Sequence, residues 1–142
     1  MIRKALAKDI PEMMRMARAA HDALPFPLEF SEDMTRQVIA GALVSDGVLA
    51  LVLDLEGVQG AIVGALTSYP FGPQVWAREV FFWVDPEVRA GCAKPLIEAF
   101  EAWAREQKAV VIGMSCTADG RTQKLFERLG FVAMETNMIK AV

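Results

Sequence analysis

A long apolar run, Val75–Val84, most constrains the fold of this chain. It is rich in aromatic and β-branched residues and ends at Asp85-Pro86, so it predicts a strand. Its length and apolarity favour a central position with both faces covered. Helical spacing of apolar residues follows over Leu96–Ala104, and Ala109–Met114 predicts another buried strand. A strand, a helix and a strand in this order indicate two parallel strands in one sheet.

Two helices are predicted before this unit. Asp9 is placed to cap the first, with Glu12 three residues later as its capping-box partner. Ser31 is placed to cap the second, and acidic residues follow it in the first turn, where the helix dipole favours them. The predicted apolar face of the second helix consists of Met34, Val38, Ile39 and Leu43.

The remaining strands surround these helices in the sequence. Ile2–Leu6 predicts a short first strand, and Val48–Asp54 with Val58–Leu66 predicts an antiparallel hairpin. A last helix, capped by Asp119, stops at Gly130, and residues 131–140 predict one or two final strands. The order β-α-α-β-β-β-α-β-α-β describes an α/β fold, a mixed and mostly antiparallel sheet flanked by about four helices. Residues 1–142 are expected to form a single domain.

Charge and cysteine content exclude several functions. The net charge of −3 is scattered and forms no basic stripe, which argues against nucleic acid as a partner. Cys92 and Cys116 make no disulfide framework, and no cysteine or histidine cluster predicts a metal. The N-terminus lacks an apolar signal core, and the apolar runs are too short to span a membrane. A soluble cytoplasmic protein is expected, and its 54% hydrophobic content suits either a generous core or a dimer interface.

The segments 84–94 and 119–131 resemble, in their sequence motifs, the GNAT superfamily of N-acyltransferases. The segment 84–94 (Val-Asp-Pro-Glu-Val-Arg-Ala-Gly-Cys-Ala-Lys) is similar to the family's Val-x-Pro strand end, followed by Arg-Gly-x-Gly-x-Gly/Ala and a helix. The segment 119–131 is similar to the family's Asn and its helix with Leu-Tyr-x-Lys-x-Gly-Phe. The predicted element order is also that of the family. Leu24-Pro25-Phe26 resembles a segment of the small phage and prophage members.

The resemblance implies acetyl-CoA as cosubstrate, with no metal. It assigns backbone groups of Phe82, Trp83 and Val84 to the pantetheine arm. The pyrophosphate cradle that it implies consists of Arg89, Ala90, Gly91, Cys92, Ala93 and Lys94, and further coenzyme contacts fall on Asp119 and Phe126. Independently of the family, a loop that enters a helix N-terminus offers N–H donors and the positive end of a dipole to a phosphate.

The chain departs from the family pattern at four positions. Cys92 and Lys94 stand where small glycine or alanine residues are usual, and Asp119 replaces an asparagine. Phe126 stands where many members have a tyrosine taken to protonate the departing thiolate. A thiol titrates at about 8.5, so a coenzyme thiolate can leave without this acid.

Glu79 is the candidate general base, because an amine must lose a proton before it attacks a thioester. Arg78 and Glu79 point to opposite faces of a strand, and the sequence does not decide which faces the cleft. The resemblance implies transfer of an acetyl group to a primary amine of a small molecule, peptide or protein. The alternative is a non-catalytic coenzyme-binding sensor or interaction module with the same fold. Dimers are common in the family, which leaves a homodimer open.

Overall fold

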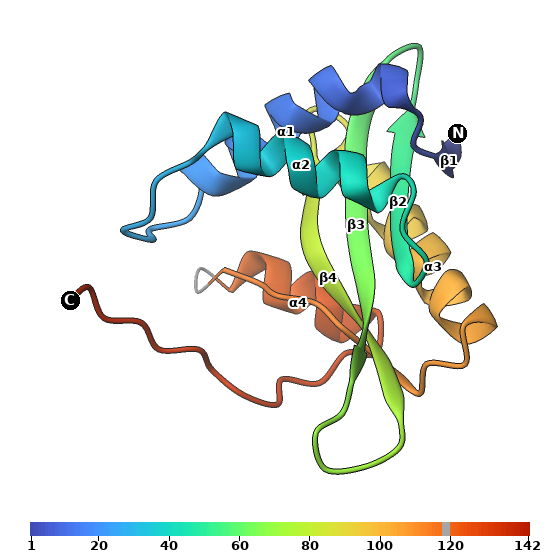
Figure 1. Cartoon of the computed structure of the whole chain (residues 1–142), viewed down its shortest axis with the longest axis vertical. Helices are drawn as coiled ribbons and strands as arrows, with labels where there is room; N and C mark the ends of the chain where they lie inside the picture. Colours follow the sequence, from blue (N-terminus) through green and yellow to red (C-terminus); the bar gives the residue numbers. More distant parts are fainter. Residues whose placement is uncertain (118–119) are drawn as a thin grey trace.

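The computed structural model (Figure 1) describes residues 1–117 and 120–142. Five strands form one sheet in the order β1-β2-β3-β4-β5. Their bounds are Ile2–Lys4 (β1), Val48–Asp54 (β2), Val58–Ser68 (β3), Val75–Val84 (β4) and Val111–Gly113 (β5). The first four strands pair antiparallel, and β4 pairs parallel with β5. The predicted mixed α/β fold is therefore confirmed.

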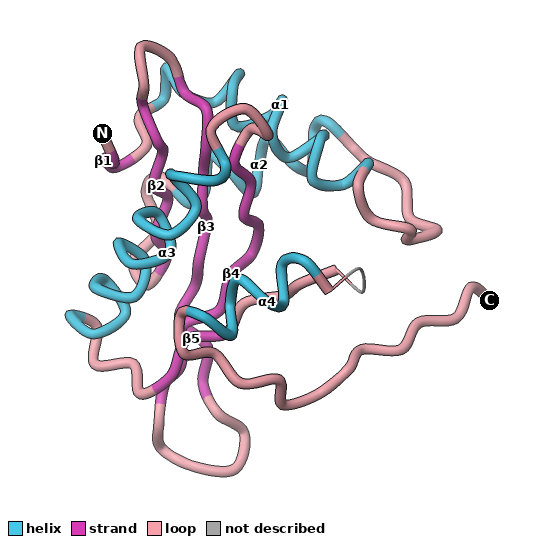
Figure 2. Tube along the Cα trace, turned by 180° about the vertical axis from the view of Figure 1, so that it is seen from behind, coloured by secondary structure: helices cyan, strands magenta, loops and turns pink. Residues whose placement is uncertain are grey.

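Four α-helices flank this sheet (Figures 1 and 2). They are Ile10–Asp22 (α1), which follows a 3-10 turn at Ala7–Asp9, Glu32–Ala42 (α2), Arg89–Glu106 (α3) and Arg121–Arg128 (α4). Helices α1 and α2 bury their apolar stripes on one face of the sheet, in a core that includes Met13, Ile39 and Val63. The opposite face packs against α3 through Leu96 and Phe100.

Helix α2 confirms its predicted cap and corrects its predicted apolar face. The Ser31 Oγ accepts a hydrogen bond from the Met34 N–H at 3.2 Å, which satisfies one orphan donor of the first turn. Ile39 is fully buried, but Met34 and Val38 are exposed. The two exposed residues lie one turn apart on the outer surface of α2, because only its inner stripe reaches α1 and β2.

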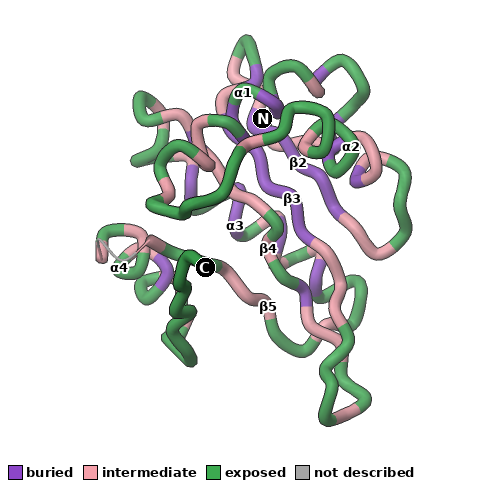
Figure 3. The backbone as a smooth tube through the Cα atoms, turned by 60° about the vertical axis from the view of Figure 1, so that its left-hand side comes forward, coloured by how far each residue is buried: buried purple, intermediate pink, exposed green. Residues whose placement is uncertain are grey.

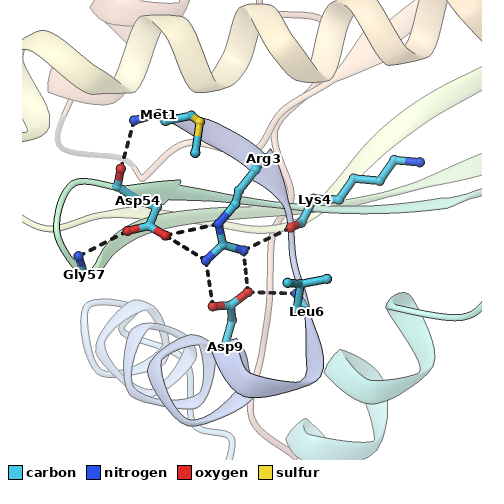
Figure 4. Close-up of polar contacts among 7 residues, drawn as sticks. All are labelled: Met1, Arg3, Lys4, Leu6, Asp9, Asp54 and Gly57. Carbon is cyan, nitrogen blue, oxygen red and sulfur yellow. Dashed lines mark hydrogen bonds and ion pairs between the residues drawn. The ribbon is translucent and has the colours of Figure 1, made fainter.

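Asp9 does not form the predicted capping box with Glu12, since its side chain makes no hydrogen bond to the first turn of α1. Its carboxylate instead accepts hydrogen bonds from the Leu6 N–H at 2.8 Å and from both Arg3 Nη atoms at 2.7 and 3.0 Å (Figure 4). The same guanidinium binds Asp54 at the end of β2. This network ties β1 to β2 and α1, and it lowers the pKa of both carboxyls.

Helix α3 begins earlier than the sequence predicted. Residues 89–94 were predicted as a loop before the helix, with Pro95 in the first turn, but the helix starts at Arg89 and Pro95 lies inside it. Proline has no N–H, so α3 lacks the hydrogen bond that this residue would otherwise donate to the carbonyl of Gly91. The small residues of the motif are thus the first turns of α3.

The two strands of the parallel pair are less buried than predicted. β3 is the central strand, whereas β4 lies next to the edge and many of its side chains are only half-buried. β5 was predicted as a buried strand, yet it is the edge strand and Val110 and Val111 are 63% and 53% exposed. Figure 3 shows the contrast, with β2 and β3 largely buried and β5 partly exposed.

The chain after α4 does not form the predicted final strands. Helix α4 ends as expected before Gly130, whose φ of 91° suits glycine at a helix C-terminus. Residues 131–142 then run as an extended arm without regular secondary structure (Figures 1 and 2). No neighbouring strand pairs with this arm in the described chain, so its β propensity is unsatisfied.

Candidate active site

The candidate site lies where β4 and β5 separate. The parallel register runs from Trp76↔Val111 to Arg78↔Gly113 and ends there. At the next position the Glu79 Oε2 accepts a hydrogen bond of 3.0 Å from the Ser115 N–H. The Glu79 side chain thus makes the next contact after the last backbone pair between β4 and β5. Beyond it, the edge of β4 on this side is free of a partner strand within the described residues.

A β-bulge in β4 sits at the same place. β3 and β4 pair at Val63↔Phe81 and at Gly64↔Glu79, so Val80 is an extra residue on β4. Bulges bend a strand and redirect its side chains, and they occur often beside active sites. Gly64 is required opposite the bulge, because a Cβ there would overlap the Phe100 ring of α3.

The side chain of Glu79 lies on the α3 face of the sheet, because its partner Gly64 faces Phe100. Arg78 lies on the opposite face, where its guanidinium stacks on the Trp76 ring at 4.5 Å. Burial raises the pKa of Glu79, while the Ser115 N–H and the Arg78 charge act in the opposite direction. The sequence did not decide whether Arg78 or Glu79 faces the cleft. In the structure, the Glu79 side chain lies where β4 and β5 separate.

The N-terminus of α3 follows the free end of β4 and has no side-chain cap, although the Gly91 N–H donates a hydrogen bond of 3.3 Å to the Val88 carbonyl. Val88 occupies the cap position and has no side-chain acceptor, and the first turn carries no acidic residue. The Asp85 carboxylate, three residues before the cap, is engaged elsewhere by two hydrogen bonds from Arg15 and one from the Trp83 Nε1. Gly91 is exposed, and a Cβ on it would meet open space. Uncapped N–H groups with an open approach form a typical anion site.

The side chain of Arg89 connects the start of α3 to the end of β4. Its Nε donates a hydrogen bond of 3.0 Å to the Val84 carbonyl, and its guanidinium lies 4.9 Å from the centre of the Trp83 ring. The predicted phosphate ligand is therefore folded back onto the last residues of β4. Its hydrogen bond uses the Val84 carbonyl, which the family resemblance assigned to the pantetheine arm.

The other residues of the predicted cradle do not share one orientation. Ala90 and Lys94 are exposed, and Lys94 Nζ lies 3.6 Å from a Glu98 carboxylate oxygen. Cys92 is half-buried and Ala93 is buried, both against the α3 side of the sheet. This split follows from helical geometry, because a helix presents only part of each turn to solvent.

The residues predicted beyond α3 contribute differently. Phe82 packs into the α3-side core, on the free part of β4. Phe126 is buried on α4, and its ring lies 5.4 Å from that of Phe131, so it acts first as a packing residue. Asp119 lies outside the described residues.

Two contacts of the site were not predicted from the sequence. The Ser115 N–H that holds Glu79 is a backbone group and leaves no residue signature. Arg15 binds Asp85 across 70 positions of the chain, through atoms at 3.0 and 2.8 Å. This bidentate pair lowers the pKa of Asp85 and fixes the end of β4 to α1. No local spacing could have revealed it.

The described residues show no cluster of three or more histidine, cysteine or acidic side chains that could hold a metal ion. Within the same residues, no helix has the length and apolarity needed to cross a bilayer. Two cavities of about 360 and 210 Å³ lie by α1 and α2, away from Glu79 and from the start of α3. The candidate site is accordingly an open strand edge, not one of these hollows.

Comparison with known proteins gives one family and many similar folds. A model of the acetyltransferase (GNAT) family matches residues 13–131. No curated sequence relative matches the chain. Similar structures include an aminoglycoside 6'-N-acetyltransferase, AAC(6')-Ig of Acinetobacter haemolyticus, at 18% identity and a TM-score of 0.78, covering 100% of this chain and 97% of that chain.

Two further structures have the same fold. The ribosomal-protein-alanine N-acetyltransferase of Brucella melitensis biovar Abortus 2308 is 16% identical with a TM-score of 0.75, and the match covers 100% of this chain and 99% of the other. AAC(6')-Iy, in complex with the bisubstrate analogue CoA-S-monomethyl-acetylneamine, is 18% identical with a TM-score of 0.77, over 100% and 97% of the two chains. Identities this low show a shared fold.

Proposed function

The chain belongs to the acetyltransferase (GNAT) family and is an N-acetyltransferase, and we propose that it uses the gap between β4 and β5 to transfer an acetyl group from acetyl-CoA to a primary amine. The observation that carries this proposal is the end of strand pairing at Glu79, which leaves the second half of β4 open beside the start of α3. An open strand edge and an uncapped helix N-terminus suit the two halves of coenzyme A.

The pantetheine arm contains amide groups, and it can pair with a free strand edge as an added strand does. Residues 82–84 offer that edge, since the β5 register ends earlier. The pyrophosphate then lies at the N-terminus of α3, near Ala90 and Gly91, where small residues let the backbone approach closely. Lys94 adds a cation on the same exposed side.

Arg89 has to change partners when the coenzyme binds. It now donates to the Val84 carbonyl, which the pantetheine arm would use, and it lies against the Trp83 ring. Arg89 is exposed at the start of α3, so its side chain can rotate toward the pyrophosphate through solvent. Arg89 thus exchanges one backbone acceptor for two phosphates.

In the reaction, the amine nitrogen forms a bond to the thioester carbonyl carbon and the carbon–sulfur bond breaks. Glu79, directly or through water, accepts the proton that the amine loses, and its raised pKa improves it as a base. Backbone N–H groups on the free edge of β4 stabilise the negative charge on the carbonyl oxygen. The thiolate takes a proton from solvent, because Phe126 cannot supply one.

The acceptor is proposed only as a class. The names of the similar structures refer to an aminoglycoside and to the alanine of a ribosomal protein, and both of those acceptors are amines. For this chain we propose a primary amine on a small molecule, peptide or protein. A cytoplasmic location, a single domain over residues 1–142 and the resemblance to phage-type members also remain proposals from the sequence.

The test is release of free thiol from acetyl-CoA in the presence of a panel of primary amines, including an aminoglycoside and a peptide with an N-terminal alanine. Release above the amine-free rate with at least one acceptor, with the acetylated amine identified by mass spectrometry, is expected. Coenzyme binding without thiol release for any amine would instead identify the chain as a non-catalytic member that senses acyl-CoA.

A further inference from the structure

Arg78 on β4 is exposed to solvent, and its side chain stacks on a tryptophan. The guanidinium lies 4.5 Å from the centre of the Trp76 ring. Within residues 1–117 and 120–142 Arg78 makes no ion pair and no side-chain hydrogen bond, whereas Arg3 and Arg15 each bind two carboxylates. Arginine is the side chain best suited to bidentate recognition of a carboxylate. A free arginine at the surface is therefore a candidate receptor for a carboxylate.

The neighbours of Arg78 on its face of the sheet carry no charge. They lie on the two adjacent strands and are Ala65, Thr67, Val111 and Gly113. Glu79 comes next in the chain, but its side chain lies on the α3 face and accepts a hydrogen bond from the Ser115 N–H. As far as the structure describes β3, β4 and β5, no acid on the same face balances the charge of Arg78.

This part of the sheet lies beyond the helices that cover the same face. The core under α1 and α2 reaches β3 at Val63 and β4 at Phe81, and Arg78 is further along β4 in the direction of the hairpin. Figure 1 shows β3 and β4 extending past both helices. Arg78 therefore faces solvent, where a ligand can reach it.

The Trp76 ring supports the guanidinium at a cost to stability. It lies against Gly113, where a Cβ would be 3.8 Å from the Trp76 Cζ3 and from the Arg78 Cγ. The indole Nε1 is buried and has no hydrogen-bond partner within the described chain. A buried donor without an acceptor costs free energy, which a phenylalanine would avoid. Tryptophan is the ring that attracts a cation most strongly, so the stack with Arg78 explains its presence better than stability does.

Arg78 and the start of α3 lie on opposite faces of the sheet, with the gap between them. In the proposed reaction the pyrophosphate lies at the start of α3. The Glu79 carboxylate is in the gap itself, because it accepts its hydrogen bond from the Ser115 N–H on the other side. An amine that approaches Glu79 from the face without the coenzyme therefore passes Arg78.

We propose that Arg78, stacked on Trp76, binds a carboxylate of the acceptor, so that the chain selects amines that also carry a carboxylate. This inference rests on the proposed acetyl transfer and adds the substrate class. The guanidinium lies over Trp76, and the three residues of strand from Trp76 to Glu79 span about 10 Å. The amine and the carboxylate of the acceptor should be separated by a similar distance. Long ω-amino acids and short peptides have this spacing, whereas an α-amino acid carries both groups on one carbon.

The experiment compares matched acceptors in the assay of thiol release from acetyl-CoA. The pairs are 8-aminooctanoate with 8-aminooctanamide, and trialanine with its C-terminal amide. For the native chain, kcat/KM should be about tenfold higher for the acid of each pair, the factor expected for a hydrogen bond between charged groups. Added salt should reduce this preference, since it is electrostatic.

Variants then assign the preference to the stacked pair. Arg78→Gln should abolish it by raising KM for the acids, with kcat/KM for the amides unchanged. Trp76→Leu should remove most of the preference, and Trp76→Phe should keep part of it, because a ring that supports the guanidinium is retained. Arg36→Gln is the matched control, since Arg36 is an exposed arginine on α2, and the ratio of acid to amide should remain native.

Failure of this inference can be told apart from failure of the proposed function. Equal use of acid and amide by the native chain, or a preference that survives Arg78→Gln, would overturn the role of Arg78 and leave acetyl transfer in place. Thiol release with amines that lack a carboxylate, but with neither acid, would do the same. No release with any amine would overturn the proposed function and this inference with it.

Discussion

The two edges of the sheet are built in opposite ways. At β1, Arg3 makes hydrogen bonds to Asp9 and Asp54, and the Met1 amino group donates to the Asp54 carbonyl (Figure 4). At β5, pairing covers only three residues, the outer side is open, and the inner side separates from β4 at Glu79. The closed edge keeps β1, β2 and α1 in place, while the open edge exposes backbone groups to ligands.

The difference shows how a small α/β domain combines stability with binding. β4 is held in position by two contacts on the side of β1. It pairs with β3, and the Arg15–Asp85 ion pair joins its end to α1. The backbone groups of β4 beyond the β5 register have no partner strand within the described residues, so they are available to a ligand. Strand edges and helix termini are costly to leave unsatisfied in a core, but at the surface they are binding sites.

The largest effect is expected at the open edge. Glu79→Gln keeps the size of the side chain and removes its basicity, so kcat for acetyl transfer should fall by about 10²-fold or more. With the native carboxylate, the rate should rise with pH through a pKa that lies above the ordinary glutamate value, because burial disfavours the charged form. Stopped assays of thiol release across pH measure both effects.

Glu106→Gln is the control, because Glu106 is an exposed acid at the far end of α3. Its rate and pH profile should match those of the native enzyme. An unchanged rate for Glu79→Gln would remove that residue from the mechanism and would leave the coenzyme site intact.

The next effect concerns packing behind the bulge. Gly64→Ala places a methyl group against the Phe100 ring, so it should lower the free energy of unfolding by about 1–3 kcal/mol. Gly41→Ala on α2 meets open space and should raise that free energy by about 0.5–1 kcal/mol. Urea unfolding of the two variants measures the contrast. Equal stability of both would show that β3 and α3 are loosely packed at the bulge.

A smaller effect is expected from acid at the closed edge. Arg3 lowers the pKa values of Asp9 and Asp54 in the folded state, so these carboxylates stabilise the fold above their unfolded pKa of about 4. That contribution is lost as the pH falls through the lower, folded values. Urea midpoints should therefore decrease steeply below about pH 4.

Asp9→Asn should lower the neutral-pH midpoint and flatten this acid dependence. Asp46→Asn, at an exposed acid in a turn, should change neither. A native-like acid dependence in Asp9→Asn would mean that the network at β1 contributes no measurable stability.

The smallest effect is expected at Lys94. Its ion pair with Glu98 is exposed on both sides, so Lys94→Ala should change the free energy of unfolding by less than about 1 kcal/mol. The same variant should weaken coenzyme A binding several-fold at low salt and less at high salt, since the contact is electrostatic. Lys108→Ala, beyond the far end of α3, should leave the affinity unchanged. Equal affinities would exclude Lys94 from the phosphate site.

Local patterns predicted the elements whose residues decide their own conformation. Val75–Val84 is a strand with the predicted bounds, and the apolar positions from Leu96 to Ala104 form the buried stripe of α3. The Ser31 cap and the end of α4 before Gly130 also follow from neighbouring residues. In each case the signal and the structure lie within a few positions of each other.

Features that depend on distant partners were not predicted. The apolar pattern of 131–140 indicates strands, but a strand also needs an edge to pair with. Asp9 looked like a helix cap, yet Arg3 and Leu6 provide better partners for it. The divergence at Glu79 needs both the bulge at Val80 and the Ser115 N–H, and neither has a local sequence signal.

The central claim is that the free edge of β4 and the start of α3 bind coenzyme A, and isothermal titration tests it most directly. The native chain should bind coenzyme A saturably, and Arg89→Ala should bind it more weakly. Arg105→Ala, at the far end of α3, should bind like the native chain. The absence of binding heat up to millimolar coenzyme A, or equal affinity of Arg89→Ala and the native chain, would contradict the account.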